Sequence, residues 1–265
     1  MTLNISKDKL AEMLMTVEFP RSAKYDPEWI AENQMGPSAL WLTEWLCREM
    51  RFGPGMRVLD MGCGKALSSV FLAREFGVQV WANDLWIPAS DNWKRIQEAA
   101  LSDRVFPIHA EARSLPYAEG FFDAIVCVDS YNFYGTDDFY LIYFSKFVKP
   151  GGQIGIVVPA LMREFNGPVP EHFTRKQSDG KIFWAEECWS VHTLAYWQNL
   201  WGRSGLIEVE VADTLPNGGR LWLQWERAIT EAGMSQFPHE LPVLEADEGR
   251  YLGFVRMVAR RKEVI

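Results

Sequence analysis

Four acidic residues stand at the ends of four short apolar segments, where carboxylates could bind the polar groups of a ligand. They are Asp60, Asp84, Glu111 and Asp129. A carboxylate can accept both hydroxyls of a ribose or the exocyclic amine of a base, and each hydrogen bond to a charged group contributes roughly 1.5–3 kcal/mol. Two such bonds at Asp84 would supply a large part of a micromolar affinity, which corresponds to about 8 kcal/mol. The pattern indicates a site for a nucleotide-like cofactor.

A glycine turn follows the first of these acids. The run Val58-Leu59-Asp60-Met61-Gly62-Cys63-Gly64 has the form of a strand, an acid and two glycines, and a helix is predicted over 65–76. Glycines let the backbone approach a ligand that any Cβ would hold off, and the positive end of the helix points to the same place. One acid alone would be explained as a solvated strand end, but four acids with this turn favour a binding site.

The residues around the turn argue against a dinucleotide. The dinucleotide fingerprint needs a small third residue, and Leu67 stands at that position. A pyrophosphate would also be repelled by Asp60, whereas a cofactor that carries an ammonium and a sulfonium would be attracted. Charge therefore favours S-adenosylmethionine (SAM), and an NAD(P)-linked oxidoreductase is a disfavoured third interpretation.

Alternating elements must position these residues. Strands are predicted over 56–60, 78–84, 105–110, 122–129, 153–158, 206–212 and 251–260, and helices over 65–76, 90–100, 137–147, 188–202 and 220–232. Such alternation predicts an α/β fold, a Rossmann-like, doubly wound and mostly parallel seven-stranded sheet. Ligands of such sheets bind outside the carboxyl ends of the strands, where all four acids fall.

Two segments lie outside this alternation. Residues 1–52 are predicted to be an N-terminal helical cap, and 53–265 the cofactor-binding domain. Residues 160–187, with several glycines and prolines, are predicted to be an inserted lid. Four of the twelve tryptophans fall between 184 and 201. They are interpreted as packing of core and lid, and the alternative is an aromatic pocket for an apolar, aromatic or cationic substrate.

Composition limits the partners and the compartment. The formal net charge is −8, and the one basic cluster is 260–262, so nucleic acid and an anionic membrane surface are not expected as partners. The four cysteines form no CxxC pair and have no metal-ligand spacing with the four histidines, so no metal site is expected. Free thiols, a polar N-terminus and the lack of a long apolar stretch predict a cytoplasmic protein.

At these residues the chain resembles the class I SAM-dependent methyltransferases, of the small-molecule type 11-like kind. The likeness rests on four pieces: Val58–Gly64, Asp84 after the second strand, Ser114–Tyr117 followed by Phe121–Asp123, and the Phe147–Gly152 turn. It covers roughly residues 36–160. It implies a SAM site lined by Gly62, Gly64, Asp84, Leu85, Glu111, Ala112 and Asp129. Asp60, through its charge, and Cys63, within the turn, complete the predicted cofactor-binding set.

The chain departs from the family pattern at two positions. Ala66 replaces the third glycine, which is a mild change because alanine suits a helix start. Glu111 stands where the family often has aspartate, and this puts its contact with adenine in question.

The sequence designates no firm catalytic residue. Methyl transfer is a displacement at an already activated carbon, so alignment and exclusion of water contribute most. Weak candidates for a base or a flanking group are His192, Tyr131 and Tyr134. The segment from Asp129 to Asn132 lacks the two prolines typical of enzymes that methylate nucleobase amines. The sequence also lacks the Pro-Cys pair that a cytosine-C5 enzyme needs, so nucleobase acceptors are not expected.

The predicted function is methyl transfer from SAM to a small-molecule acceptor, at an N, O or C atom. The alternative is a regulatory module that binds SAM or a nucleotide without transfer. A homodimer is an additional prediction about assembly.

Overall fold

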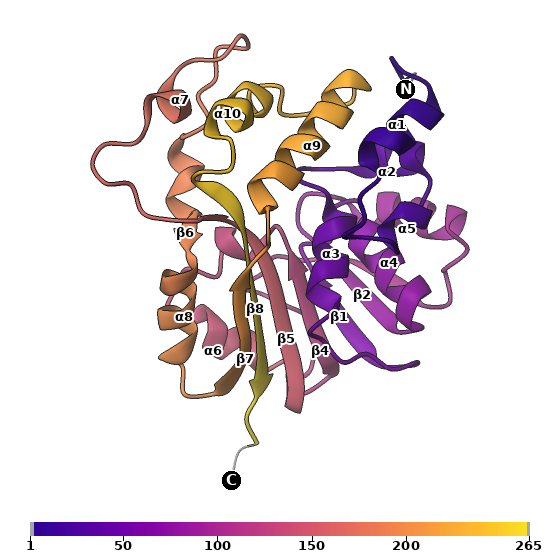
Figure 1. Cartoon of the computed structure of the whole chain (residues 1–265). Helices are drawn as coiled ribbons and strands as arrows, with labels where there is room; N and C mark the ends of the chain where they lie inside the picture. Colours follow the sequence, from indigo (N-terminus) through magenta and orange to yellow (C-terminus); the bar gives the residue numbers. More distant parts are fainter. Residues whose placement is uncertain (1–2, 264–265) are drawn as a thin grey trace.

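An eight-stranded sheet lies between two layers of helices in the computed structural model, which describes residues 3–263 apart from the side chain of Glu187 (Figure 1). The strands are β1 (Arg57–Met61), β2 (Gln79–Asp84), β3 (Val105–His109), β4 (Phe122–Val128), β5 (Val148–Leu161), β6 (His192–Thr193), β7 (Ile207–Thr214) and β8 (Leu252–Arg261). The outermost two residues at each end, which belong to the predicted 1–52 and 53–265 segments, lie outside the described residues.

The strand order confirms the predicted fold class. Across the sheet the order is β3-β2-β1-β4-β5-β8-β7, and the short β6 pairs with the end of β5. β1 to β5 run parallel to one another, whereas β8 is antiparallel to both β5 and β7. The order reverses between β1 and β4, and ligands of open α/β sheets bind beyond the strand ends at such a reversal.

Helices cover both faces of the sheet. They are α1 (Lys7–Leu14), α2 (Pro27–Asn33), α3 (Ala39–Cys47), α4 (Leu67–Phe76), α5 (Ala89–Glu98), α6 (Tyr140–Ser145), α7 (Glu171–Thr174), α8 (Leu194–Gly202), α9 (Gly218–Glu231) and α10 (Glu240–Asp247), with single 3₁₀ turns η1 (Ser22–Lys24), η2 (Tyr131–Phe133) and η3 (Glu186–Ser190). Figure 1 shows α3 and α4 on one side of the sheet and α6 and α8 on the other.

Alternate residues of the strands fill two cores, one on each face. In β1, Val58 belongs to the core under α3, α4 and α9, and Leu59 belongs to the core under α6 and α8. Both side chains are fully buried. Successive side chains of a strand point to opposite faces, so a strand that is covered on both sides reads as continuously apolar.

Several predicted boundaries were wrong. The predicted turn over 149–152 and strand over 153–158 form one strand, β5. β8 pairs with it from Gln153 to Leu161, and residues 149–152 bulge where its register with β4 shifts between Phe122 and Ala124. The predicted helix over 188–202 begins only at Leu194, after η3 and β6. The helix predicted over 137–147 is shortened to α6, since residues outside it form turns.

The segments outside the alternation pack onto the same molecule. α3 packs against α4, β4 and β5, so part of the predicted 1–52 cap belongs to a helix layer of the sheet. Residues 160–161 are the end of β5, and α7 within the predicted lid packs against α10. The division into a cap, a domain and a lid stays a prediction.

Candidate functional site

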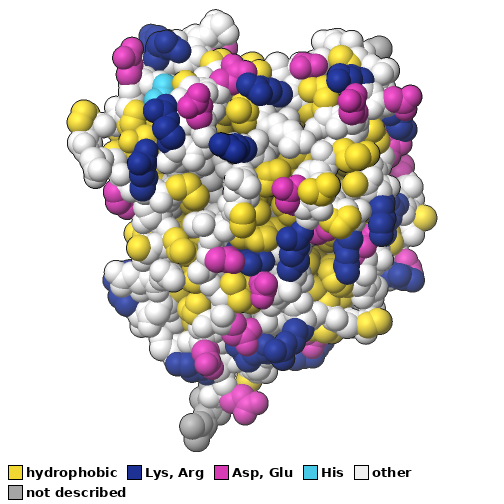
Figure 2. Space-filling view, viewed as in Figure 1, with side chains coloured by type: hydrophobic (Ala, Val, Ile, Leu, Met, Phe, Trp, Pro, Cys, Tyr) yellow, Lys and Arg dark blue, Asp and Glu magenta, His cyan; other side chains and the backbone are white. Residues whose placement is uncertain are grey.

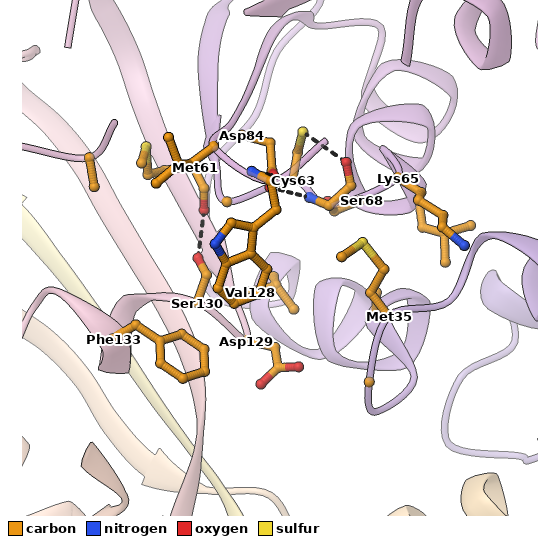
Figure 3. Close-up of a pocket in the computed structure, with 18 of the residues that line it drawn as sticks. Met35, Met61, Cys63, Lys65, Ser68, Asp84, Val128, Asp129, Ser130 and Phe133 are labelled. Atoms are coloured by element: carbon orange, nitrogen blue, oxygen red, sulfur yellow. Dashed lines mark hydrogen bonds between the residues drawn. The ribbon is translucent and has the colours of Figure 1, made fainter. Parts of the chain in front are cut away.

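A cavity of about 250 Å³ opens beyond the carboxyl ends of β1, β2 and β4, at the reversal of strand order (Figure 3). Residues of five segments line it: 33–39 between α2 and α3, 61–68 around the glycine turn, 84–86 and 111–113 after β2 and β3, and 128–134 after β4. The parallel strands bring the four segments that follow β1 to β4 together because their carboxyl ends share one edge of the sheet.

Most of the predicted site residues meet in this cavity. Its lining includes Gly62, Cys63, Gly64, Asp84, Leu85, Glu111, Ala112, Asp129 and Tyr134. Residues up to 72 positions apart in the chain therefore face a common space, although the role of each in binding stays a prediction.

Asp60 does not reach the cavity. Its carboxylate is fully buried beneath the turn and accepts hydrogen bonds from the hydroxyls of Ser68 (2.6 Å) and Ser69 (2.5 Å) in the first turn of α4. Burial raises the pKa of Asp60 to about 6, although the two serine hydroxyls act in the opposite direction. Asp60 therefore joins β1 to α4, which is a different position from the cofactor contact predicted for it.

Two of the catalytic candidates also lie outside the cavity lining. Tyr131 is fully buried in the core under α6 and α8, where its ring contacts Trp197 and Trp201. His192 lies in β6 with its ring stacked on Tyr196, at 3.6 Å between centroids, and burial lowers its pKa. The structure thus separates both side chains from the predicted cofactor residues.

Tyr134 lines the cavity, but its hydroxyl is held by the protein. It lies 2.9 Å from Ser130 Oγ and 3.0 Å from Cys127 Sγ, and Ser130 Oγ donates to the carbonyl of Met61 at 2.9 Å. Burial raises the pKa of the Tyr134 hydroxyl well above its usual value, so the side chain is neutral at physiological pH. It can shape the cavity wall but is poorly suited to accept a proton.

The glycine turn is required for close packing and for its backbone conformation. Gly62 has φ +73°, and a Cβ at this position would lie 2.0 Å from Ser130 Oγ. The amides of Gly62 and Cys63 donate to the carbonyl of Asn83, and the amide of Gly64 donates to Asp84 Oδ2 at 2.8 Å. These N–H groups are already bonded within the protein, so the turn offers no free amide nest for a pyrophosphate.

Asp84 is positioned by the backbone. Its Oδ1 accepts hydrogen bonds from the amides of Trp86 (2.7 Å) and Ile87 (2.9 Å), in addition to the bond from Gly64 to Oδ2. A carboxylate has about four acceptor positions, so about one remains for a ligand, on Oδ2. The structure therefore favours one strong hydrogen bond from a ligand hydroxyl to Asp84.

Glu111 lines the cavity and is held by Arg113. Its Oε2 accepts a hydrogen bond from the backbone amide of Arg113 at 2.7 Å, and the Arg113 guanidinium lies 3.8 Å from Oε1. The carboxylate is therefore fixed in the cavity lining by its own loop.

The sequence did not indicate the segment over 33–39, which forms one wall of the cavity. Met35 lies against the glycine turn, since a Cβ on Gly64 would be 3.0 Å from Met35 Sδ. Two hydrogen bonds with the C-terminal part of the chain hold this segment. Trp225 Nε1 donates to the Gly36 carbonyl at 2.9 Å, and Gln34 donates to the Met234 carbonyl at 2.8 Å. Contacts across about 190–200 positions leave no local sequence signal.

The structure confirms core packing for two of the four clustered tryptophans. Trp197 and Trp201 are fully buried in the core under α6 and α8. Trp184 packs against Phe165 within the 160–187 segment, and Trp189 is 59% exposed. None of the four, and no described residue of 160–187, lines the cavity.

Residues 3–263 hold neither a cluster of metal-ligand side chains nor a membrane-spanning helix. No group of three or more histidine, cysteine, aspartate or glutamate side chains is placed to hold a metal ion. No helix in this part of the chain has the length and hydropathy that crossing a bilayer would need.

Comparisons with known proteins agree with the geometry. A family model described as a methyltransferase domain matches residues 58–152. The chain is 32% identical over 137 residues to methyltransferase GfsG of Streptomyces halstedii, which covers 50% of this chain and 48% of that protein. It is 29% identical over 126 residues to demethylmenaquinone methyltransferase of Mycobacterium marinum, covering 47% and 48%. The chain thus spans about half the length of these curated relatives.

Solved structures share the fold at low identity. Geranyl diphosphate C-methyltransferase from Streptomyces coelicolor A3(2) has a TM-score of 0.64 at 18% identity, covering 83% of this chain and 79% of that one. The [4+2]-cyclase SpnF has a TM-score of 0.67 at 19% identity, covering 88% and 85%. Both likenesses concern the arrangement of strands and helices.

Proposed function

Because the chain belongs to the class I SAM-dependent methyltransferase family, we propose that it transfers a methyl group from SAM to a small-molecule acceptor in this cavity. The observation that carries the proposal is the convergence of eight of the nine predicted cofactor residues on one cavity at the reversal of strand order. The matched family segment, 58–152, contains the glycine turn and the residues that follow β2, β3 and β4.

The donor groups of the cavity suit SAM. Oδ2 of Asp84 is open to a ribose hydroxyl, and Glu111 lies where it can accept from an adenine amine. The turn residues Gly62 to Gly64 offer no free amides for phosphates, which SAM lacks. When bound, SAM supplies an electrophilic methyl carbon, and the protein contributes binding, alignment and the exclusion of water.

We expect Asp84→Ala to weaken the binding of S-adenosylhomocysteine (SAH), the demethylated product, by more than tenfold, because a charge-assisted hydrogen bond is lost. Isothermal titration calorimetry with SAH, SAM and NAD would measure this. Asp103→Ala is the matched control, since that carboxylate is exposed and lies outside the cavity lining. Asp84 also holds three amides, so Asp84→Asn is a second variant that keeps the side-chain volume, and melting curves report on the fold.

Three outcomes would contradict the proposal in different ways. An unchanged SAH affinity of both Asp84 variants would remove that residue from the site. A wild-type protein that binds neither SAM nor SAH at millimolar concentration would overturn the function itself. Preferential binding of NAD would favour the oxidoreductase interpretation.

A module that binds SAM without methyl transfer is the second candidate. It is favoured by the SpnF likeness, since that chain has the same fold and its name describes a cyclase. The two candidates differ in turnover. A transferase converts SAM to SAH when a suitable acceptor is added, whereas a binding module forms no SAH whichever acceptor is added.

We further propose that the protein acts in the cytoplasm and forms a homodimer. Support for the compartment comes from the four cysteines, all of them buried and none in a disulfide among residues 3–263. On the face shown in Figure 2, basic and acidic side chains are interspersed, as expected for a protein whose ligand is a small molecule. Light scattering after size exclusion would measure the mass in solution.

We propose that the segment 33–37, and not 160–187, closes the cavity. Met35, Gly36 and Pro37 line it, whereas the described residues of 160–187 do not. The helical segment over 1–52 would then act as a cap on the 53–265 domain through this stretch. Faster hydrogen exchange of 33–37 without SAH than with it would support the proposal, and equal exchange would refute it.

A further inference from the structure

The cavity has a second half on the side away from the glycine turn and Asp84, and it includes Asp129, which the sequence assigned to the cofactor. Its walls are the segment after β4, with Asp129 and Phe133, and the facing stretch with Met35 and Pro37. In the view of Figure 3, the Asp129 carboxylate lies between Phe133 and Met35, on the side of the cavity away from Asp84. This half is available to a second ligand when the glycine-turn half is filled.

Asp129 differs from the other two carboxylates of the cavity in having no partner. Asp84 accepts three backbone amides and Glu111 accepts one, whereas the Asp129 side chain makes no hydrogen bond or ion pair with any residue in 3–263. Its backbone has φ +54°, which an aspartate adopts at a cost. A strained, half-buried carboxylate without a partner calls for a donor from a ligand.

The neighbouring polar groups cannot supply that donor. Ser130 donates to the Met61 carbonyl, and Tyr134 is bonded to Ser130 and Cys127. On the other side, Oδ2 of Asp129 approaches the backbone of Gly36, where a Cβ would lie 2.8 Å away. The carboxylate is therefore enclosed by the protein on these sides and open to the cavity.

The charges around Asp129 argue against a ligand whose group next to this carboxylate is an anion. The cations in the cavity lining are Lys65, which donates to the Glu32 carbonyl, and Arg113, which is paired with Glu111. A further titratable group that interacts with Asp129 is Glu240 of α10, whose pKa is raised mainly by burial and also by the charges of Glu226 and Asp129. An anionic ligand atom at this point would be repelled by the carboxylate of Asp129.

An apolar wall continues from Asp129 to the mouth of the cavity. Trp86 is 69% exposed and Phe133 is 45% exposed, and their ring centroids lie 6.0 Å apart. Two exposed rings beside a cavity are large apolar surfaces left open to water, and they suit an apolar ligand body.

We propose that the acceptor is an apolar molecule whose reactive atom carries an O–H or N–H, and that Asp129 accepts the hydrogen bond from that group. This rests on the proposed function. As the acceptor atom forms its bond to the methyl carbon, the electron pair of the broken S–C bond stays on sulfur, and the acceptor proton passes to Asp129. Burial raises the pKa of Asp129 to about 7, which suits a carboxylate that takes up a proton near neutral pH.

Binding of four naphthalene probes to the SAH-saturated protein tests the proposal without turnover. 2-Naphthol and 2-naphthylamine carry a donor, 2-methoxynaphthalene has none, and 2-naphthoate is anionic. Calorimetry at pH 8 should give at least tenfold tighter binding of the donor probes to wild type. In Asp129→Asn and Asp129→Ala this preference should fall to within about twofold, as expected for the loss of one charge-assisted hydrogen bond. The two donor arms tell hydroxyl from amine.

Matched variants separate the roles of the residues. Phe133→Ala should weaken all four probes by a similar factor, and Phe139→Ala, which removes an exposed ring outside the cavity lining, should change none. A donor preference that survives in both Asp129 variants, tightest binding of 2-naphthoate, or no probe bound by wild type at 1 mM (roughly 4 kcal/mol) would overturn the proposal. SAH affinity, measured in the same titrations, is the separate criterion for the proposed function.

Discussion

At the scale of single residues, the site depends on how closely backbone and side chains approach. Two features require a glycine at position 62: its φ is +73°, and Ser130 occupies the space that a Cβ would take. From the sequence, this glycine was expected to let a ligand approach the backbone. The structure adds a second reason, which is close packing against Ser130, just after β4. Asp60 was expected to contact the cofactor, but it is buried and bonded to Ser68 and Ser69. The two hydroxyls at the start of the following helix are a sequence signal from which this could have been inferred.

We expect Gly62→Ala to destabilise the fold by about 2–5 kcal/mol, the sum of overpacking and backbone strain, and to weaken SAH binding more than tenfold. Gly151→Ala is the matched control, because Gly151 has φ +76° and open space around its Cβ position. The control should lose only about 1–2 kcal/mol. Urea unfolding and calorimetry would measure both; equal losses in the two variants would show that Ser130 exerts no steric effect.

At the scale of elements, the sequence predicted those strands and helices whose position depends on neighbouring residues. The strands from β1 to β4 and the helix after the glycine turn follow from short apolar runs and turn residues. The wall at 33–37 could not be predicted, since its conformation is set by Trp225 and by the Met234 carbonyl, about 200 positions away. The start of α8 was misplaced because Cys188 and Trp189 are as apolar as the helix that follows them.

We expect Trp225→Phe to loosen that wall, because the half-buried Gly36 carbonyl loses its hydrogen bond from the indole (2.9 Å). The free energy of unfolding should fall by about 1–3 kcal/mol, and SAH binding should weaken. Hydrogen exchange of 33–37 should become faster. Trp197→Phe is the control, since that indole N–H makes no hydrogen bond within the described residues and lies in the other core. Equal protection of 33–37 in both variants would contradict the assignment.

At the scale of the whole molecule, burial of carboxylates makes stability depend on pH. The pKa of Asp60 is about 6 in the folded protein, above its usual value of 3.8. A raised carboxyl pKa favours folding at low pH and loses that contribution as the pH rises from about 4 to 6. Asp60 is fully buried, so this dependence can be read as a free energy of unfolding.

We expect wild type to lose about 2 kcal/mol more stability than Asp60→Asn between pH 4.5 and 7.5. The asparagine does not titrate, and it can still accept from Ser68 or Ser69. Urea unfolding at the two pH values would measure the difference. Asp103→Asn, an exposed change, should retain the wild-type dependence. Parallel pH curves of wild type and Asp60→Asn would refute the assigned pKa.

The position of β8 has a consequence for synthesis of the chain. β8 fills the gap between β5 and β7, and it is the last of the three to leave the ribosome. Until then the nascent chain carries two bare strand edges, one on β5 and one on β7, that face each other across an unfilled slot. Such edges pair readily with foreign strands, so a translation pause shortly before residue 252 would be the moment at which this protein most needs a chaperone.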